Sequence, residues 1–581
     1  MTQLLLLKNK TKHAFFPLLY ILFLAPTLLA QSNSFNGATD SNWGTATNWS
    51  LGIIPTATHD VTVTGGKNVF IDIAFATCNS LTVTDGNLSI SGNLNVVGTT
   101  AITIAEGSTL TLENNASLIQ SGYEGANIGN INVIRNTTPI ILDDYTYWSS
   151  PTTGTQTLAD FSPLTQRDKI FTYNNAWISA NANTETFTKG IGCIFRSPEN
   201  ISTTVPTISP YLFTGTPNNG DVDVSVVLGS NPESLRLVGN PYPSAMDADT
   251  FILDNLIGIG SINQTITGTL AFWTHNHTLS GNSYSASDYA KYNLSGQIAV
   301  PFGTGNTSAP SGYIASGQGF FVEVIANGNV SFRNYMRLDS GNTNFYRTNP
   351  RNTSRAVLEK HRVWLNLTNA TTNVSQTLVG YIQSATNGVD PGFDSLLAGT
   401  EKFVLYSLIN SQPFALQGRA LPFKDIDIVP LGYKIDLAGN ATITLDHVDG
   451  LFLNGQKIFL EDQLLKVTHD LKLAPYTFST GAGTFNNRFL LRYLNTPLGL
   501  ENFKDLSQTV AITSTEQEIT IKSQLDSIEQ VAIFDVLGRL IFENKKINKH
   551  EIVVSGLNKG QSLIIKIHLT NGQIVSKKIM H

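Results

Sequence analysis

Apolar and polar residues alternate at every second position along most of this chain, a pattern typical of β-strands with one buried face. Between residues 31 and 135, short runs of this kind, among them NSLTVTDG and NLNVVG, begin about every eight to ten residues and end at Gly or Asn. Runs this short and even suit a sandwich or a solenoid, and the repeated frame L-x-V/I-x-x-G favours stacked coils. We therefore predict a β-solenoid or β-helix-like repeat region over residues 31–135.

The next two regions keep the strand pattern but differ in their turns. Residues 136–350 add aromatic and Pro-rich stretches such as YTYWSSPTTG, and helical periodicity is rare there. We predict an aromatic-rich β-domain with one short helix in DADTFILDNL, capped by Asp247. Residues 351–497 contain strand candidates punctuated by Gly, Asn, Pro and Asp, which predicts an antiparallel β-sandwich.

The last region, residues 509–581, follows a short linker at residues 498–508 and contains about seven strand candidates. DVLGR supplies a turn in which Gly538 takes a positive φ, and TNGQ supplies an Asn-Gly turn, the strongest short hairpin signal. We predict a small Ig-like β-sandwich here. The whole chain is then all-β, with N-terminal solenoid-like repeats followed by β-sandwich domains.

The start of the chain differs from everything that follows. Lys8, Lys10 and Lys12 precede the apolar run AFFPLLYILFLAPTLLA, which ends at Ala30 before polar QSNS. A basic stretch followed by a short apolar one predicts a secretory signal peptide over residues 1–30. No later run reaches the ~20 apolar residues of a membrane span, so we expect no transmembrane segment in the mature protein.

Composition narrows the classes of function. Only 14% of the residues are charged, against ~25% in an ordinary soluble domain, and the net charge is −6. Because the chain has no basic footprint, we expect no nucleic-acid partner. Cys78 and Cys193 could pair in an oxidising compartment, but we favour the interpretation that both are buried small hydrophobic residues.

The tail carries the most specific resemblance. IEQVAIFDVLGRLIF, INKHEIVVSGL and LIIKIHLTNGQIVSKKI resemble the C-terminal sorting domains of the type IX secretion system of Bacteroidota, and within them the type C subgroup. The resemblance implies that the tail is an export address and that the type IX secretion machinery is a partner. The residues placed like that family's characteristic ones are Gly538, Arg539, Asn571, Gly572, Lys577, Lys578 and Ile579.

Two other parts of the chain are similar to secreted flavobacterial surface proteins. The opening W…TNWS…P…D resembles the N-terminal part of large surface proteins of that group. GNPYPSA, FWTHN and GYIASGQGFFV resemble, in the same order, a segment of secreted proteins with no assigned activity. These resemblances imply export and imply no particular chemistry.

Candidate metal ligands are few. His275 and His277 in WTHNHT would share one face of a strand and could hold a metal ion, although polar loop positions explain them better. Asp247 and Asp249 could bind calcium, although helix capping explains Asp247 better. We therefore predict no cofactor, with calcium as the alternative.

Aromatic residues offer a second kind of site. On a β-scaffold, exposed rings can stack against sugars, and Trp148, Trp273 and Tyr313 are the candidates for glycan contact. The alternative is that such rings fill the core between irregular loops. The sequence contains no nucleophile elbow, phosphate-binding Gly loop, zinc-protease helix or dinucleotide fingerprint, so we predict that the protein is not an enzyme.

These observations together favour an exported, adhesin-like protein that is secreted or held at the cell surface, outside the outer membrane. It would contact a surface, a glycan or another cell. The alternative is a secreted polysaccharide-acting enzyme or a carbohydrate-binding protein. A tight cleft lined by carboxylates would favour the enzyme, and an exposed row of aromatic residues would favour sugar binding.

Overall fold

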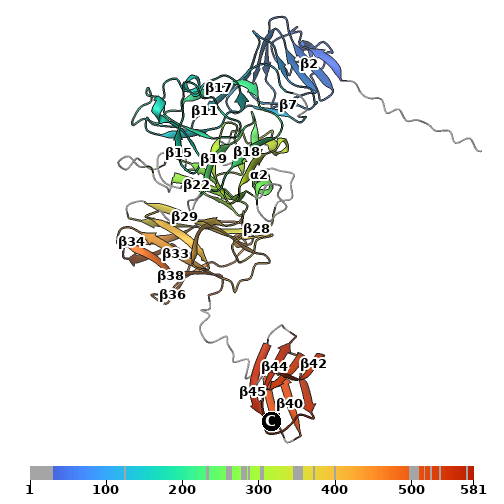
Figure 1. Ribbon diagram of the computed structural model, residues 1–581, viewed down its shortest axis with the longest axis vertical. Coiled ribbons are helices and arrows are strands. Elements are labelled where there is room, and N and C mark those ends of the chain that lie inside the picture. Colours follow the sequence, from blue (N-terminus) through green and yellow to red (C-terminus); the bar gives the residue numbers. More distant parts are fainter. Residues whose placement is uncertain are drawn as a thin grey trace, which may run out of the picture. The chain divides into compact units, whose positions relative to one another are not determined.

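The computed structural model describes residues 30–122, 126–229, 234–256, 265–276, 284, 288–300, 307–343, 358–370, 373–397, 401–495, 510–515, 517–523, 526–535, 538–570 and 574–581. They form two compact units, one ending at Tyr493 and one from Leu494 to His581. Strands make up nearly all of the regular structure (Figure 1), which confirms the predicted all-β fold. The helices are α1 (Leu158–Phe161), α2 (Ala248–Asn255) and the 3-10 turns η1 (Ala46–Asn48), η2 (Arg167–Lys169), η4 (Asn334–Met336) and η5 (Gly450–Leu453).

The chain first winds into a β-solenoid, which confirms the predicted repeats. Each strand pairs in parallel with its equivalent in the next coil, so that Val63, Val83 and Ile104 stack in the buried interior. The sheets are β1-β2-β5-β8, β4-β7-β10 and a third that contains β3-β6-β9. Their strands are β1 (Gln31–Ser34), β2 (His59–Val63), β3 (Lys67–Ile71), β4 (Phe75–Cys78), β5 (Ser80–Val83), β6 (Gly86–Ile90), β7 (Asn93–Val96), β8 (Thr103–Ile104), β9 (Thr109–Leu112) and β10 (Ser117–Gln120).

The TNWS opening covers the first coil. β1 pairs with β2, and the backbone N–H of Trp43 donates to Phe70 O of β3 at 2.8 Å. Trp49 donates its indole N–H to Trp43 O at 2.8 Å, and the two buried rings meet edge to face. Because an open β-edge invites further strand pairing, this cap protects the start of the solenoid.

Side chains from later in the chain cover the last coil. Among the described residues no strand extends its sheet beyond β10, and the outer carbonyls of β10 and of the residue before it accept side-chain hydrogen bonds instead. Asn342 donates to Ala116 O at 2.5 Å, Arg337 donates to Leu118 O at 2.6 Å, and Asn334 donates to Gln120 O at 2.7 Å. The backbone N–H of Leu118 donates to Pro243 O. Pro243 of GNPYPSA and three side chains from residues 334–342 therefore cover the end of this sheet.

The aromatic-rich region grows out of the solenoid. β11 (Ile131–Asn136) extends the third solenoid sheet and pairs antiparallel with β17, so both regions share a sheet and one hydrophobic core. The predicted helix is present as α2, and Asp247 caps it by accepting the backbone N–H of Thr250 at 2.6 Å. The remaining strands are β12 (Tyr145–Trp148), β13 (Thr152–Thr153), β14 (Ile170–Tyr173), β15 (Trp177–Ser179), β16 (Cys193–Arg196), β17 (Pro210–Pro217), β18 (Val222–Val226), β19 (Leu235–Gly239), β20 (Ala245–Asp247), β21 (Ile266–Trp273), β22 (Tyr289–Asn293), β23 (Gly296–Ile298), β24 (Tyr313–Ile314), β25 (Gly319–Val324), β26 (Gly328–Phe332) and β27 (Arg337–Leu338).

Their pairing leaves one five-stranded antiparallel sheet, β19-β25-β21-β22-β23, at the centre of this region. Beside it lie the sheets β12-β16-β14-β15, β18-β26 and β24-β20-β27. One face of the five-stranded sheet, including Leu270 and Phe320, is buried in the second hydrophobic core. The opposite face carries the groove described below.

The third region is one sheet curled around its own core. Its order is β36-β35-β38-β33-β31-β32-β29-β28-β34-β37, with β30 added beside β32. Ile443 of β34 and Leu460 of β35, from opposite ends of that order, share one hydrophobic core, which gives the sandwich-like packing. The strands are β28 (Lys360–Asn369), β29 (Val374–Ile382), β30 (Ser395–Leu396), β31 (Val404–Ile409), β32 (Gln412–Ala420), β33 (Ile428–Ile435), β34 (Gly439–Val448), β35 (Phe459–Asp462), β36 (Val467–Asp470), β37 (Tyr476–Thr480) and β38 (Gly483–Arg492).

The second unit is a small Ig-like sandwich of two antiparallel sheets, β39-β40-β43 and β42-β41-β44-β45. Ile519, Val531 and Ile565 are among the residues that fill its separate core. Every strand predicted for this tail is present. The strands are β39 (Val510–Ser514), β40 (Glu518–Ser523), β41 (Ile528–Asp535), β42 (Leu540–Lys549), β43 (Glu551–Ser555), β44 (Ser562–Leu569) and β45 (Ile574–Met580).

Candidate functional site: an aromatic groove

The histidine pair does not form a metal centre within the described residues. His275 is buried, and its ring lies 3.3 Å from Asp144 Oδ2 through Nδ1 and 3.0 Å from Thr138 Oγ1 through Nε2. Both ring nitrogens are therefore occupied by protein groups. His277 lies outside the described residues. Across the described ranges, no group of three or more His, Cys, Asp or Glu is arranged to hold a metal ion.

The aspartates in DADTFILDN have local structural partners. Asp247 caps α2, and Asp249 accepts the hydroxyl of Tyr292 at 2.6 Å. Asp254, near the end of the helix, accepts the hydroxyl of Tyr335. Because the three carboxylates face different partners, they do not converge on one cation.

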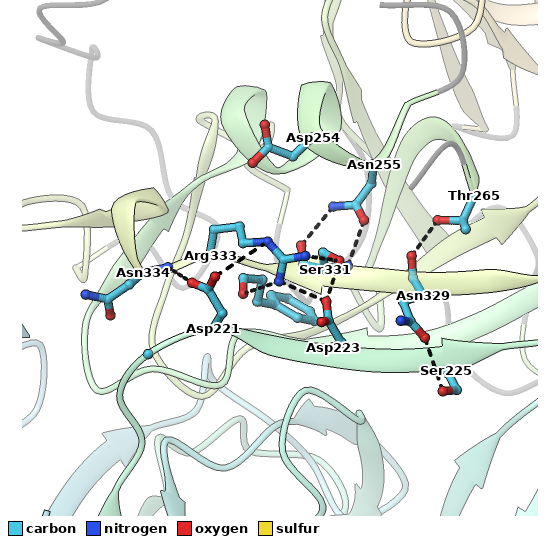
Figure 2. Close-up of polar contacts among 12 residues, drawn as sticks. Asp221, Asp223, Ser225, Asp254, Asn255, Thr265, Asn329, Ser331, Arg333 and Asn334 are labelled. Carbon is cyan, nitrogen blue, oxygen red and sulfur yellow. Dashed lines mark hydrogen bonds and ion pairs between the residues drawn. The ribbon is translucent and has the colours of Figure 1, made fainter. Parts of the chain in front are cut away.

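A different acidic cluster lies between β18 and β26 and is neutralised by an arginine (Figure 2). Arg333 places Nη1 2.8 Å from Asp223 Oδ1 and Nε 3.8 Å from Asp221 Oδ2. Ser331 donates its hydroxyl to the same Asp223 oxygen. The side-chain amide of Asn255 ties α2 to the backbone of Ser331, accepting its N–H at 2.7 Å and donating to its carbonyl oxygen at 2.9 Å. This network joins a helix to a strand pair, which is a structural task.

The structure corrects two of the three glycan-contact predictions. Trp148 is 0% exposed and packs among Phe161, Tyr211 and Phe213, so no ring face is open to a sugar. Tyr313 is 5% exposed and equally enclosed. Trp273 is partly exposed and stacks on Tyr147 with a centroid separation of 5.8 Å. Ring burial in this region follows from long-range packing, which the sequence pattern does not report.

An open groove of about 290 Å³ lies on the face of the five-stranded sheet opposite its core. Strand alternation builds it, because side chains two apart on a strand share a face. Ala271 pairs with Phe321 on one side and Lys291 on the other, which puts these three in one row across the sheet. The groove is lined by Tyr173, Trp177, Leu235, Thr269, Ala271, Tyr289, Lys291, Phe321, Val322, Glu323, Ser395, Leu396, Leu397 and Glu401.

Four aromatic residues contribute to the apolar lining of the groove, and one of them, Tyr173, contacts two of the others. Tyr173 of β14 meets Trp177 of β15 edge to face at 4.9 Å and Phe321 of β25 at 5.0 Å. These contacts fix the rings, yet Trp177 remains 45% exposed. An indole held rigidly at a groove offers a broad apolar surface at low entropic cost to a ligand.

Two buried side-chain oxygens of groove residues have no hydrogen-bond partner among the residues that the structure describes. Glu401 is only 8% exposed, and its Oε2 accepts no hydrogen bond from any described residue. Thr269 Oγ1 is likewise buried and makes no hydrogen bond within the described ranges. Burying a carboxylate oxygen without a hydrogen bond costs free energy, so this arrangement is primed for an external donor. Lys291 and Glu323 are the other charged residues of the groove.

The wall opposite the sheet comes from the third region. Asp394 accepts the backbone N–H groups of Asp390 at 2.6 Å and Gly418 at 2.9 Å, which anchors the strand Ser395–Leu396. Burial raises the pKa of the Asp394 carboxyl to about 7. Ser395 is buried, whereas Leu396 is exposed at the rim.

The predicted sorting residues lie at a turn and on the last strand. Gly538 has φ +79°, as the DVLGR turn requires, and Arg539 pairs with Asp535 at 2.6 Å. Lys577 donates to Val510 O of the other sheet at 2.7 Å, Lys578 is exposed, and Ile579 packs against the module's core. Asn571 and Gly572 lie outside the described residues.

Both cysteines are free and buried, in agreement with the favoured interpretation. Burial raises the pKa of the Cys78 thiol to about 12 and also raises the pKa of Cys193. Neither thiol is therefore a nucleophile in the folded chain.

Sequence reasoning missed the groove itself. Its wall joins residues between Tyr173 and Glu401, and none of them forms a local motif. The one available signal was Trp177 and Tyr173 in IFTYNNAWIS, two rings on either side of an Asn-Asn turn. Glu401 carries no signal in the sequence, because only the folded chain buries it.

Comparison with known proteins places the chain in a family. It belongs to the family described as a domain of unknown function (DUF8693), whose model matches residues 34–493. A second family model, also described as a domain of unknown function (DUF8694), matches residues 498–581. A search of curated proteins found no match. No helix among the residues described is long and apolar enough to span a membrane.

Two solved structures show limited likeness. A DUF3244 family protein with an immunoglobulin-like β-sandwich fold from Bacteroides vulgatus is 17% identical, with a TM-score of 0.12, and the match covers 13% of this chain and 84% of that one. A β-glucuronidase from Ruminococcus gnavus, in complex with D-glucuronic acid, is 11% identical, with a TM-score of 0.10. That match covers 25% of this chain and 37% of the enzyme. Neither TM-score supports an inference about this chain.

Proposed function

We propose that this member of the DUF8693 family is an exported, adhesin-like protein of the cell surface or medium, addressed by its C-terminal module. The observation that carries the proposal is that Leu494–His581 folds as a unit with its own core. A sorting signal has to be read without unfolding its cargo, and a separate module meets that need. The resemblance of this module to type IX sorting domains supports the same assignment.

The rest of the chain suits contact better than chemistry. The described residues hold no metal cluster, and both described thiols are buried and free. Few of the residues are charged, so capture of a highly charged ligand by long-range steering is not favoured. The open groove is the ligand-contacting feature.

The test is fractionation of cells that possess a type IX system and express either the full chain or a chain cut after Glu501, followed by antibody. We expect the full chain at the cell surface or in the medium and the truncated chain in the periplasm. Equal arrival of both forms outside would contradict the proposal. The truncated protein is checked for a cooperative unfolding transition, so that misfolding is not mistaken for failed export.

A point variant sharpens this test. Lys578 and Lys545 are both exposed lysines of the same module, but only Lys578 lies in the predicted signal. We expect Lys578→Ala to reduce the exported fraction and Lys545→Ala to leave it unchanged. Equal effects of the two variants would show that the export signal does not lie in the last strand.

A polysaccharide-acting enzyme is the second candidate, favoured by the presence of two carboxylates, Glu323 and Glu401, in one groove. Paired carboxylates are the catalytic groups of most glycoside hydrolases. Release of reducing ends from a polysaccharide by the purified chain, abolished by Glu401→Gln, would establish this function. We expect no such release.

A further inference from the structure

We infer that the aromatic groove is a binding subsite for an uncharged pyranose ring of a glycan. The inference rests on the proposed adhesive function and names the chemistry of its contact. It uses three features of the groove that are independent of one another: a ring platform, unpartnered buried oxygens and the balance of charge.

The platform is Trp177. Its indole is 45% exposed at the groove and is held by Tyr173 at a centroid separation of 4.9 Å. A pyranose has one face of C–H bonds and a rim of hydroxyl groups. The C–H face can lie on the indole, which buries apolar surface without reorganising either partner.

The rim hydroxyl groups find partners in the groove. Glu401 offers a buried carboxylate oxygen that accepts no hydrogen bond from the described residues, and Thr269 Oγ1 is in the same position. A ligand hydroxyl donating to Glu401 would remove the cost of a buried oxygen without a partner. Small Ala271 leaves room above the sheet between Phe321 and Lys291.

Charge and size select among sugars. The lining carries two carboxylates, Glu323 and Glu401, and one ammonium, Lys291. An anionic ring such as a uronic acid would place a third carboxylate beside the first two and is disfavoured. The volume, about 290 Å³, is at the lower end of ligand pockets and suits one or two rings.

The experiment is titration calorimetry of the purified full chain with a panel of oligosaccharides. The panel contains gluco-, manno-, galacto-, xylo- and N-acetylglucosamine oligomers, with oligogalacturonate as the anionic comparison. We expect one or more uncharged oligomers to bind at least about tenfold more tightly than oligogalacturonate. No binding of any uncharged oligomer at millimolar concentration, or equal binding of oligogalacturonate, would overturn the inference.

Variants locate the binding. We expect Trp177→Ala to weaken binding about tenfold or more and Glu401→Gln to weaken it about fivefold. The matched controls are Phe75→Ala, an aromatic residue 61% exposed on the solenoid, and Glu106→Gln, an exposed glutamate, and both should bind as the unaltered chain does. Binding that survives Trp177→Ala, or cleavage of the oligomer that depends on Glu401, would overturn the inference. Export is read separately by fractionation, so failure here leaves that result intact.

Discussion

Two aromatic clusters lie a short distance apart in the sequence and have opposite fates. Around Trp148, rings from β12, α1 and β17 close on one another and leave the indole 0% exposed. Around Trp177, rings from β14, β15 and β25 hold one another edge to face but leave the indole open. The first is a core, and the second has the form of a binding platform.

The difference lies in what covers each cluster. Trp148 is enclosed because β17 returns antiparallel beside β11 and brings Tyr211 and Phe213 over it. Trp177 lies on β15, where the rings of Tyr173 and Phe321 pack against it but leave it 45% exposed. Because β12 and β15 are the two edge strands of the same sheet, the rings that cover each tryptophan, and not its edge position, account for the difference.

The largest difference between the two tryptophans is expected in their contribution to the free energy of unfolding. Trp148→Ala opens a large cavity and should lower the free energy of unfolding by about 3–5 kcal/mol, whereas Trp177→Ala should change it by less than about 1 kcal/mol. Both losses are measured by denaturant unfolding of the full chain, from the unfolding transition of the larger unit, which ends at Tyr493. Similar losses for the two variants would mean that Trp177 is a core residue and would contradict the comparison.

A smaller loss of stability is expected where side chains of Asn334, Arg337 and Asn342 cover the last coil of the solenoid. Arg337 is buried and hydrogen-bonds Leu118 O and Asn219, so Arg337→Met should cost about 2–3 kcal/mol by leaving these acceptors unpaired. The control Lys169→Met removes an exposed ion pair with Asp168 and should cost less than about 1 kcal/mol. Equal losses for the two variants would show that the buried hydrogen bonds of Arg337 stabilise the fold no more than a surface ion pair does.

The groove wall should respond to pH. Burial raises the pKa of Asp394 to about 7 in the folded chain. Between about pH 4 and pH 7 the folded chain therefore keeps the Asp394 proton, whereas the unfolded chain has lost it. Stability therefore falls as pH rises through that window, by about 1.4 kcal/mol per pH unit, and levels off above it. Unfolding measured from pH 4.5 to 8 should show this slope in the unaltered chain and a flatter one in Asp394→Asn. Parallel slopes would contradict the assignment.

The smallest effect concerns the closed interior. Burial raises the thiol pKa of both cysteines, so a thiol reagent at pH 8 should label neither Cys78 nor Cys193 in the folded chain. Both should label fully in denaturant. Rapid labelling of either thiol without denaturant would show that the interior opens locally.

How much the sequence reveals depends on the range of the contacts. The tail was predicted strand by strand because its turns, such as the one at Gly538, are local signals. Asp247 was correctly assigned as a helix cap for the same reason. β32 gives little local signal, since its run QPFALQGRA lacks clear alternation and is buried through parallel pairing with β29.

The candidate site was beyond the sequence for a physical reason. Whether Trp148 or Trp177 is open depends on the rings that distant strands bring beside them, from β17 for Trp148 and from β25 for Trp177. The unpartnered oxygen of Glu401 is a property of the packed chain alone. The sequence could name aromatic residues as candidates but could not sort core from platform.

The most direct measurement of the central claim is acrylamide quenching of tryptophan fluorescence in the purified chain and in Trp177→Phe, with and without a bound uncharged oligosaccharide. We expect that the readily quenched part of the emission is largely lost in Trp177→Phe and is protected by the sugar in the unaltered chain. Equal quenching of the two proteins, or no protection by a sugar that binds, would contradict the claim that Trp177 is the open platform.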